Sequence, residues 1–86
     1  MPTISYFYGI FIRMFLDDHA PPHFHAIYGE FTAIIDIQAL EVIKGDLPRR
    51  ACELVLDWTE LHQDELMCNW DLCRQHVSPH TIEPLR

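Results

Sequence analysis

Three of the six histidines in this 86-residue chain lie within the segment Asp17-Asp18-His19-Ala20-Pro21-Pro22-His23-Phe24-His25. Imidazole nitrogens bind transition metals and exchange protons near neutral pH, so a group of them can support metal binding or acid–base chemistry. Each proline fixes its own φ and favours an extended backbone at the residue before it. The segment therefore presents three imidazoles on a partly ordered loop, and it is the strongest candidate site in the sequence.

A metal site is one interpretation of this segment. If residues 23–28 form a strand, His23 and His25 project from the same face, about 6.5–7 Å apart along the strand. Two imidazoles at this spacing can converge on one ion, and His19 can supply a third ligand from the preceding loop. Three neutral nitrogens with an open fourth position would hold zinc or another divalent transition metal in a hydrolytic site.

An enzyme built on this site would be a small metal-assisted hydrolase or endoribonuclease. Its candidate catalytic residues are His23, His25, Asp18 and Arg13. Asp18, with Asp17 beside it, would orient an imidazole or accept a proton. Arg13 would stabilise a phosphate oxyanion if its side chain emerges near the loop. The sequence carries neither a Gly-rich phosphate loop nor a nucleophile elbow.

The alternative interpretation of the histidine segment is structural. The pattern H-x-H is short and occurs often by chance, and the sequence identifies no further ligand. The prolines would then shape a turn, His23 and His25 would bond to local carbonyls or carboxylates, and Phe24 would pack in the core. In that case the loop could still contact a partner protein without any metal.

The net charge of −7 is unevenly distributed and limits the possible partners. Residues 51–86 contain seven acidic residues and only two arginines. Such a surface repels phosphate groups, so direct nucleic-acid binding is not expected, whereas a basic protein surface would be attracted. No apolar run reaches the roughly 18 residues that span a bilayer, and the N-terminus lacks a secretory signal pattern. We therefore expect a cytoplasmic protein that does not enter a membrane.

The first half of the chain has the pattern of β-strands. Four segments are rich in β-branched, aromatic or alternating apolar residues and are separated by turn residues: 9–16, 23–28, 31–37 and 40–44. The connections are too short for crossovers, which predicts an antiparallel meander of three to four strands. Because both faces of residues 9–16 are largely apolar, we expect that strand to be central and covered on two sides.

The second half has the pattern of α-helix. Asp46 is the expected N-cap, with Pro48 in the first turn, where its missing N–H is harmless. Two apolar sets at helical spacing are expected to face the sheet: Ala51, Leu54, Val55, Trp58 and Leu61, followed by Leu66, Met67, Trp70 and Cys73. The phase changes around His62 and Gln63, which predicts one kinked helix or two helices. The sequence thus predicts a single α+β domain over residues 1–78 and an extended tail over residues 79–86.

Three cysteines, Cys52, Cys68 and Cys73, lie in this helical half. Their spacing matches neither a zinc ribbon nor a redox C-x-x-C motif. Cysteine in such a position usually packs as a small apolar residue, so we expect structural roles for all three.

Several short motifs together resemble a family of small bacterial proteins, domain of unknown function forty-one sixty. They extend over nearly the whole chain: Met1-Pro2-Thr3-Ile4-Ser5, Gly9-Ile10, Ile12-Arg13-Met14, Asp18-His19, Pro21-Pro22-His23-Phe24-His25, Tyr28-Gly29-Glu30, Ile35-Asp36-Ile37, Leu47-Pro48-Arg49-Arg50-Ala51, Trp58, Leu61-His62 and Asn69-Trp70-Asp71-Leu72. The resemblance implies a gene next to another small uncharacterised protein, in a toxin–antitoxin-like or regulatory module. It brings no established catalytic residues.

Two functions follow as hypotheses. The first is a protein-interaction component of a two-gene module, which binds a small partner encoded nearby through an exposed sheet face or edge and the histidine loop. A homo-oligomer is also compatible with the sequence. The second is the metal-assisted hydrolase or endoribonuclease that uses His19, His23 and His25.

Overall fold

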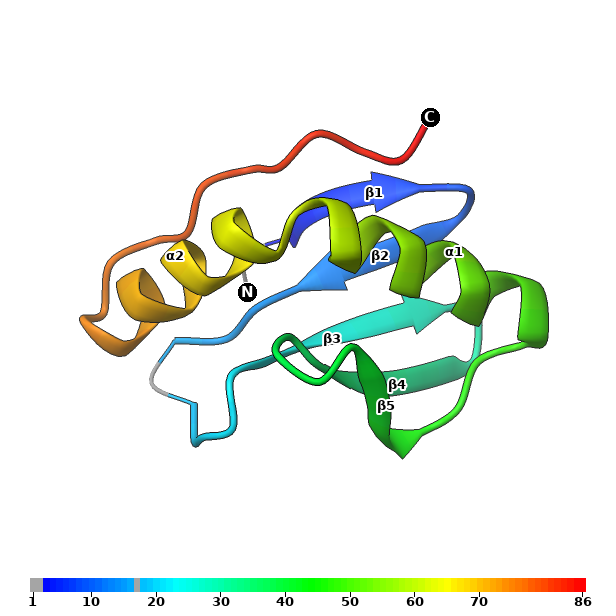
Figure 1. The fold of residues 1–86 in the computed structure, drawn as a ribbon, viewed down its shortest axis with the longest axis horizontal. Helices are drawn as coiled ribbons and strands as arrows, with labels where there is room; N and C mark the ends of the chain where they lie inside the picture. The colour runs from blue at the N-terminus through cyan, green and yellow to red at the C-terminus, as the bar shows by residue number, and fades with distance from the viewer. Residues whose placement is uncertain (1–2, 17) are drawn as a thin grey trace.

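An antiparallel sheet of five strands forms the first half of the chain in the computed structural model, which describes residues 3–16 and 18–86 (Figure 1). The strands are β1 (Thr3–Phe7), β2 (Ile10–Arg13), β3 (His23–Tyr28), β4 (Phe31–Asp36) and β5 (Glu41–Gly45). Their order in the sheet is the order along the chain. The predicted α+β class and antiparallel meander are therefore confirmed, but the sheet has five strands, not three to four.

The strand that the sequence did not predict is β1. It joins β2 through Tyr8 and Gly9, which have positive φ values of 50° and 81°. A two-residue hairpin turn often requires positive φ at both central residues, and Asn-Gly or Asp-Gly is the usual sequence signal. Tyrosine seldom adopts this conformation. The turn, and with it the strand that precedes it, therefore has no standard signature.

The second strand is shorter and less covered than the sequence predicts. β2 ends at Arg13 instead of Leu16, and both helices lie on one face of the sheet (Figure 1). On that face Ile10 and Ile12 are fully buried, whereas Phe11 on the opposite face is 39% exposed. The expectation of a strand covered on two sides is thus wrong. The apolar residues on the second face of β2 lie on the side of the sheet that the helices leave uncovered.

Two helices follow the sheet, α1 (Arg49–Leu61) and α2 (Gln63–Arg74). They are separated at His62, with φ −120° and ψ 24°, where the sequence predicts a kink or break. The predicted cap at Asp46 is wrong: Pro48 occupies the N-cap position, and no side-chain cap bond is found there within the described residues. Leu47 is buried, so the chain enters the core before the helix begins, and Asp46 is left exposed.

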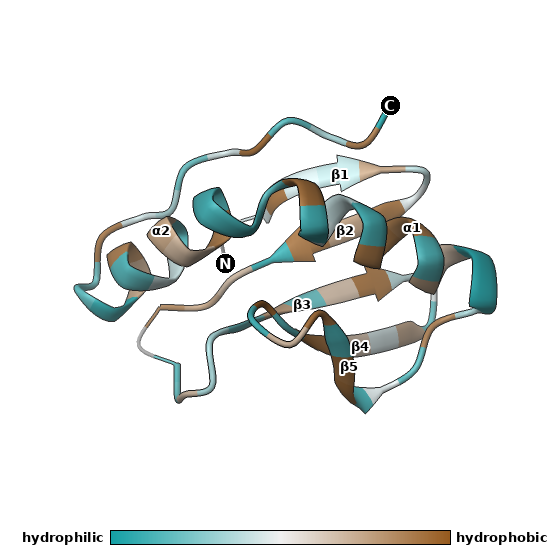
Figure 2. Cartoon of the chain, in the orientation of Figure 1, coloured by the Kyte–Doolittle hydropathy of each residue, from teal (hydrophilic) through white to brown (hydrophobic). Residues whose placement is uncertain are grey.

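The hydrophobic core lies between the sheet and the helices, and hydrophilic residues occupy the outer sides of both helices (Figure 2). Trp58 is fully buried at its centre, with ring centroids 5.3 Å from Phe7 and 5.8 Å from Phe24. The sequence predicts that Leu61 faces the core, but Thr59 is buried there instead. The Thr59 hydroxyl donates to the Val55 carbonyl, one turn earlier in α1. Leu61 is instead 69% exposed.

The C-terminal segment, residues 77–86, has an irregular conformation and packs back on the domain. The Asn69 side chain both donates to the His80 carbonyl and accepts from the His80 N–H. Farther along, the Ile82 N–H donates to the Ile4 carbonyl of β1 at 2.7 Å, and the Trp58 indole N–H donates to the Glu83 carbonyl at 2.8 Å. These bonds attach the segment to both helices and to the outer edge of β1.

Within the described residues, no helix combines the length and apolar character required to cross a membrane.

Candidate functional site

The two histidines of the H-x-H pattern lie on β3, as the sequence predicts. Side chains alternate between faces along a strand, so His23 and His25 share one side while Phe24 and Ala26 point into the core. His23 is buried and His25 is half-buried. Their ring centroids are 5.5 Å apart.

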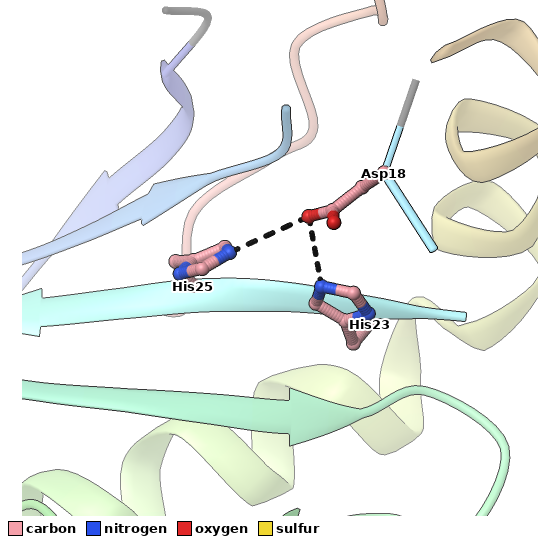
Figure 3. Close-up of side chains that lie close together, drawn as sticks. All are labelled: Asp18, His23 and His25. Carbon is pink, nitrogen blue, oxygen red and sulfur yellow. Dashed lines mark hydrogen bonds and ion pairs between the residues drawn. The ribbon is translucent and has the colours of Figure 1, made fainter. Parts of the chain in front are cut away.

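Asp18 completes a group of three with these histidines (Figure 3). Its Oδ2 lies 2.9 Å from His23 Nε2 and 3.7 Å from His25 Nε2. One potential ligand atom from each of the three residues lies within 4.8 Å of the other two. We refer to Asp18, His23 and His25 as the Asp–His cluster.

The orientation of the His23 ring is fixed from its other side. Its Nδ1 is 2.7 Å from the Pro21 carbonyl oxygen, which can only accept a hydrogen bond. Nδ1 must therefore carry a proton, and Nε2 is the nitrogen that faces Asp18. The ring also lies against Trp70 of α2, with centroids 5.1 Å apart, so helix packing restricts its movement.

The His25 ring packs against an aromatic neighbour instead of a carbonyl. Phe15 contacts it edge to face, with centroids 4.3 Å apart. His25 Nε2 is buried, and it has no hydrogen-bond partner within the described residues. A buried polar nitrogen without a partner is unfavourable, and such groups are uncommon in folded proteins.

The environment shifts the pKa values of two members of the Asp–His cluster. For His25, burial disfavours the charged ring and His23 adds repulsion; together they outweigh the attraction of Asp18 and hold the His25 pKa below its usual 6.5. Burial alone would raise the pKa of Asp18. The hydrogen bond from the His19 N–H, the charge and hydrogen bond of His23, and the polar His25 ring nearby together outweigh burial and lower that pKa.

These shifts predict that the metal-free protein loses stability in acid. Because the His25 pKa is lower in the folded state, the unfolded chain binds more protons, and the free energy of unfolding falls as the pH drops below 6.5. The lowered pKa of Asp18 adds a further loss at more acidic pH. Urea unfolding in EDTA at several pH values between about 7 and about 5 measures the first effect. The variant His25→Gln should have a shallower pH dependence; a slope equal to that of the wild type would contradict the assignment.

The other predicted site residues lie outside the Asp–His cluster. His19 is exposed, and its backbone N–H donates to Asp18 Oδ1 at 2.9 Å. Arg13 Nε donates to Thr3 Oγ1 at 3.3 Å, and the guanidinium carbon lies 5.2 Å from the centre of the Phe11 ring. Asp17 lies outside the described residues.

The cysteines do not form a second site. Cys73 is buried in the core, where burial raises the pKa of its thiol and keeps the thiolate population low. Cys52 is half-buried, but Cys68 is exposed, so the expectation that all three pack as apolar residues is wrong for Cys68. The exposed position explains why helical spacing did not include Cys68 in the buried set.

A second feature adjoins the Asp–His cluster: the sheet face opposite the helices. Residues paired in register share a face, and beyond the row of His23, Asp36 and Glu41 two further rows cross the sheet on this side. The first row contains Tyr6, Phe11, Ile27 and Thr32, and the second contains Arg13, His25, Ile34 and Lys44. We call these two rows the open face. His25 belongs both to the open face and to the Asp–His cluster.

Comparison with known proteins identifies one family. A family model described as domain of unknown function DUF4160 matches residues 9–71, which include the Asp–His cluster, β2 to β5, α1 and most of α2. No curated protein and no solved structure shows a significant match. The matched residues make up more than half of the chain and confirm the resemblance seen in the sequence. The chain belongs to the DUF4160 family.

Proposed function

We propose that this protein is a protein-interaction component of a two-gene regulatory or toxin–antitoxin-like module, and that it binds a small partner protein on the open face. The observation that carries the proposal is the apolar surface on the side of the sheet that the helices leave uncovered. Tyr6 is 53% exposed, and its ring stacks on Phe11 with centroids 4.6 Å apart. Ile27 and Ile34 continue this surface across β3 and β4.

Contiguous apolar surface of this kind is costly to leave in water and frequently marks a protein interface. Aromatic residues and arginine are also enriched at interface positions that contribute most binding energy. Here the Arg13 guanidinium lies over Phe11, so β2 presents an aromatic side chain and a cation together on the open face. These features favour protein binding over small-molecule chemistry on this face.

The charge of the open face indicates the chemistry of the partner. The protein as a whole has a net charge of −7, yet the charged residues of the two rows are Arg13 and Lys44, both cationic. The carboxylates of Asp36 and Glu41 lie on the same side of the sheet but in the neighbouring row with His23. A matching partner would present apolar side chains flanked by carboxylates, because complementary charges guide association and exclude wrong partners. The small protein encoded beside this gene is the partner to be tested first.

The proposal is tested by co-expression with the small protein encoded by the neighbouring gene. We expect a complex that co-purifies and elutes as one species in size-exclusion chromatography. Phe11→Asp places a charge in the middle of the apolar row. Loss of a residue that dominates an interface costs at least about 2 kcal/mol, so binding should weaken by about 30-fold or more.

Leu61→Asp is the matched control, because Leu61 is an exposed leucine on α1, away from the open face. It should leave partner binding unchanged, and circular dichroism should show both variants folded. Independent elution of the two wild-type proteins would contradict the proposal. So would a complex that Leu61→Asp disrupts and Phe11→Asp does not, or a self-associated protein in which the open face is already covered by a second copy.

A further inference from the structure

We infer that Asp18, His23 and His25 form a binding site for one divalent transition metal ion, with one carboxylate oxygen and two imidazole nitrogens as ligands. This inference is independent of the proposed function, because it concerns the Asp–His cluster and requires no partner protein. It rests on three observations: the direction of the His23 lone pair, the unpartnered nitrogen of His25, and the spacing of the three atoms.

The first observation is that electron-rich atoms face one another in the Asp–His cluster. The bond to the Pro21 carbonyl places a proton on His23 Nδ1, so a neutral His23 directs the lone pair of Nε2 at the Asp18 carboxylate. Two lone-pair donors 2.9 Å apart repel unless a positive charge lies between them. A metal ion bound to both atoms supplies that charge, and a proton on His23 is the alternative that the experiment must distinguish.

The hydrogen bond from His23 Nδ1 to the Pro21 carbonyl also orients the ring for metal binding. Histidines that ligate metals almost always donate their other ring N–H to a carbonyl or carboxylate, which fixes the tautomer and the ring orientation. His23 has this arrangement already, with Nδ1 on the Pro21 carbonyl and Nε2 turned into the Asp–His cluster. The ring is therefore oriented for coordination through Nε2.

The second observation concerns His25. Its Nε2 is buried without a hydrogen-bond partner within the described residues, although it points toward Asp18 (Figure 3). The distance to Asp18 Oδ2 is 3.7 Å, too long for a hydrogen bond. Coordination would give this nitrogen the partner that the fold does not provide.

The third observation is the spacing. Metal–ligand bonds of roughly 2.0–2.1 Å in a tetrahedral zinc site place neighbouring ligand atoms about 3.3 Å apart. The Asp18 Oδ2 separations of 2.9 Å and 3.7 Å lie on either side of this value. Side-chain shifts of a few tenths of an ångström would therefore bring Asp18 Oδ2 to this spacing from each imidazole nitrogen, and the three ligand atoms already lie within 4.8 Å of one another. Three protein ligands would leave a fourth position for water, as in sites where zinc acts on a substrate.

Two imidazoles and one carboxylate suit zinc, cobalt(II) and iron(II) better than the hard ions magnesium and calcium, which prefer oxygen ligands alone. The predicted set of His19, His23 and His25 differs from this one at a single position. Asp18 takes the place of His19, whose ring is exposed while its backbone N–H helps to hold the Asp18 carboxylate. The ligand set with His19 and the ligand set with Asp18 therefore predict different effects for the variants His19→Ala and Asp18→Asn.

The test is calorimetric titration of tag-free protein with Zn²⁺ and, in parallel, with Co²⁺. We expect one ion per chain. Asp18→Asn, which is nearly isosteric, and His25→Phe, which keeps a ring against Phe15, should each weaken binding by about 100-fold or more, beyond the effect of losing a supporting residue. His19→Ala is the control and should bind like the wild type. Circular dichroism verifies the fold of each variant.

A readout near the site makes the result specific. Trp70 lies against His23, so bound Co²⁺ should quench tryptophan fluorescence in the wild type and in His19→Ala, but not at the same concentration in Asp18→Asn. A wild type that binds neither ion would overturn the inference and leave a protonated His23 as the source of positive charge. Binding that His19→Ala abolishes and Asp18→Asn preserves would also overturn it. If Asp18→Asn unfolds, His19→Ala and His25→Phe give the decision. Unchanged binding in the first and weakened binding in the second support the Asp–His cluster, and binding lost in His19→Ala overturns it.

Discussion

Replacing Trp58 with alanine is expected to lower the free energy of unfolding by about 3–5 kcal/mol, the range for removing a buried tryptophan from a core. Trp58 has no exposed surface and contacts Phe7 of β1 and Phe24 of β3, so it connects α1 to two strands of the sheet. Its indole N–H also donates to the Glu83 carbonyl. Small domains have only about 5–15 kcal/mol of stability in total, so Trp58→Ala should be near the limit of folding.

Urea unfolding followed by circular dichroism measures this loss. Trp58→Phe retains part of the core volume but loses the bond to Glu83, and it should cost less, about 1–3 kcal/mol. Leu61→Ala on the same helix is the control, because its exposed side chain should change stability by no more than about 0.5 kcal/mol. Equal losses for Trp58→Ala and Leu61→Ala would show that the described packing around Trp58 is wrong.

The second large effect is expected for Gly45→Ala, at the end of β5. Gly45 has φ +74°, and a Cβ atom there would lie 2.1 Å from the Thr32 carbonyl oxygen and 3.2 Å from Ala33 Cα. These are backbone atoms of β4, which cannot rotate away as a side chain could. Left-handed strain costs about 1–2 kcal/mol and the forced separation of β4 from β5 about 1–3 kcal/mol more.

Gly29→Ala separates these two contributions. Gly29 also has positive φ, +57°, but nothing lies within 4 Å of a Cβ built there. It should show only the conformational cost, about 1–2 kcal/mol. Urea unfolding of both variants gives the difference directly. If Gly45→Ala costs no more than Gly29→Ala, the close approach of β5 to Thr32 is absent in solution.

Most of the fold could be predicted because it follows local periodicity. Strand alternation places Phe24 and Ala26 in the core, and the change of helical phase at His62 predicts the separation of α1 and α2. β1 was missed because its turn uses a tyrosine at positive φ, which has no statistical signature. The start of α1 was misplaced because burial of Leu47, a tertiary contact, decides where the chain can turn into a helix.

The candidate site was predictable only in part, because periodicity places residues on a strand but does not give the path of a loop. A period of two residues is sufficient to place His23 and His25 together. The choice between His19 and Asp18 depends on the path of the loop, which is set by local bonds such as the one from the His19 N–H to the Asp18 carboxylate. Both side chains can coordinate a metal, so residue type does not decide between them.

The bond between Ile82 and Ile4 has a consequence for the order of folding. The meander consists of hairpins whose partners are close in sequence, and such contacts form early because they close short loops. The bond from Ile82 to Ile4 closes a loop that includes nearly the whole chain, with a correspondingly larger entropic cost. The bond can form only after β1 has joined the sheet. The C-terminal segment should therefore attach to β1 last during folding and separate from it first during partial unfolding.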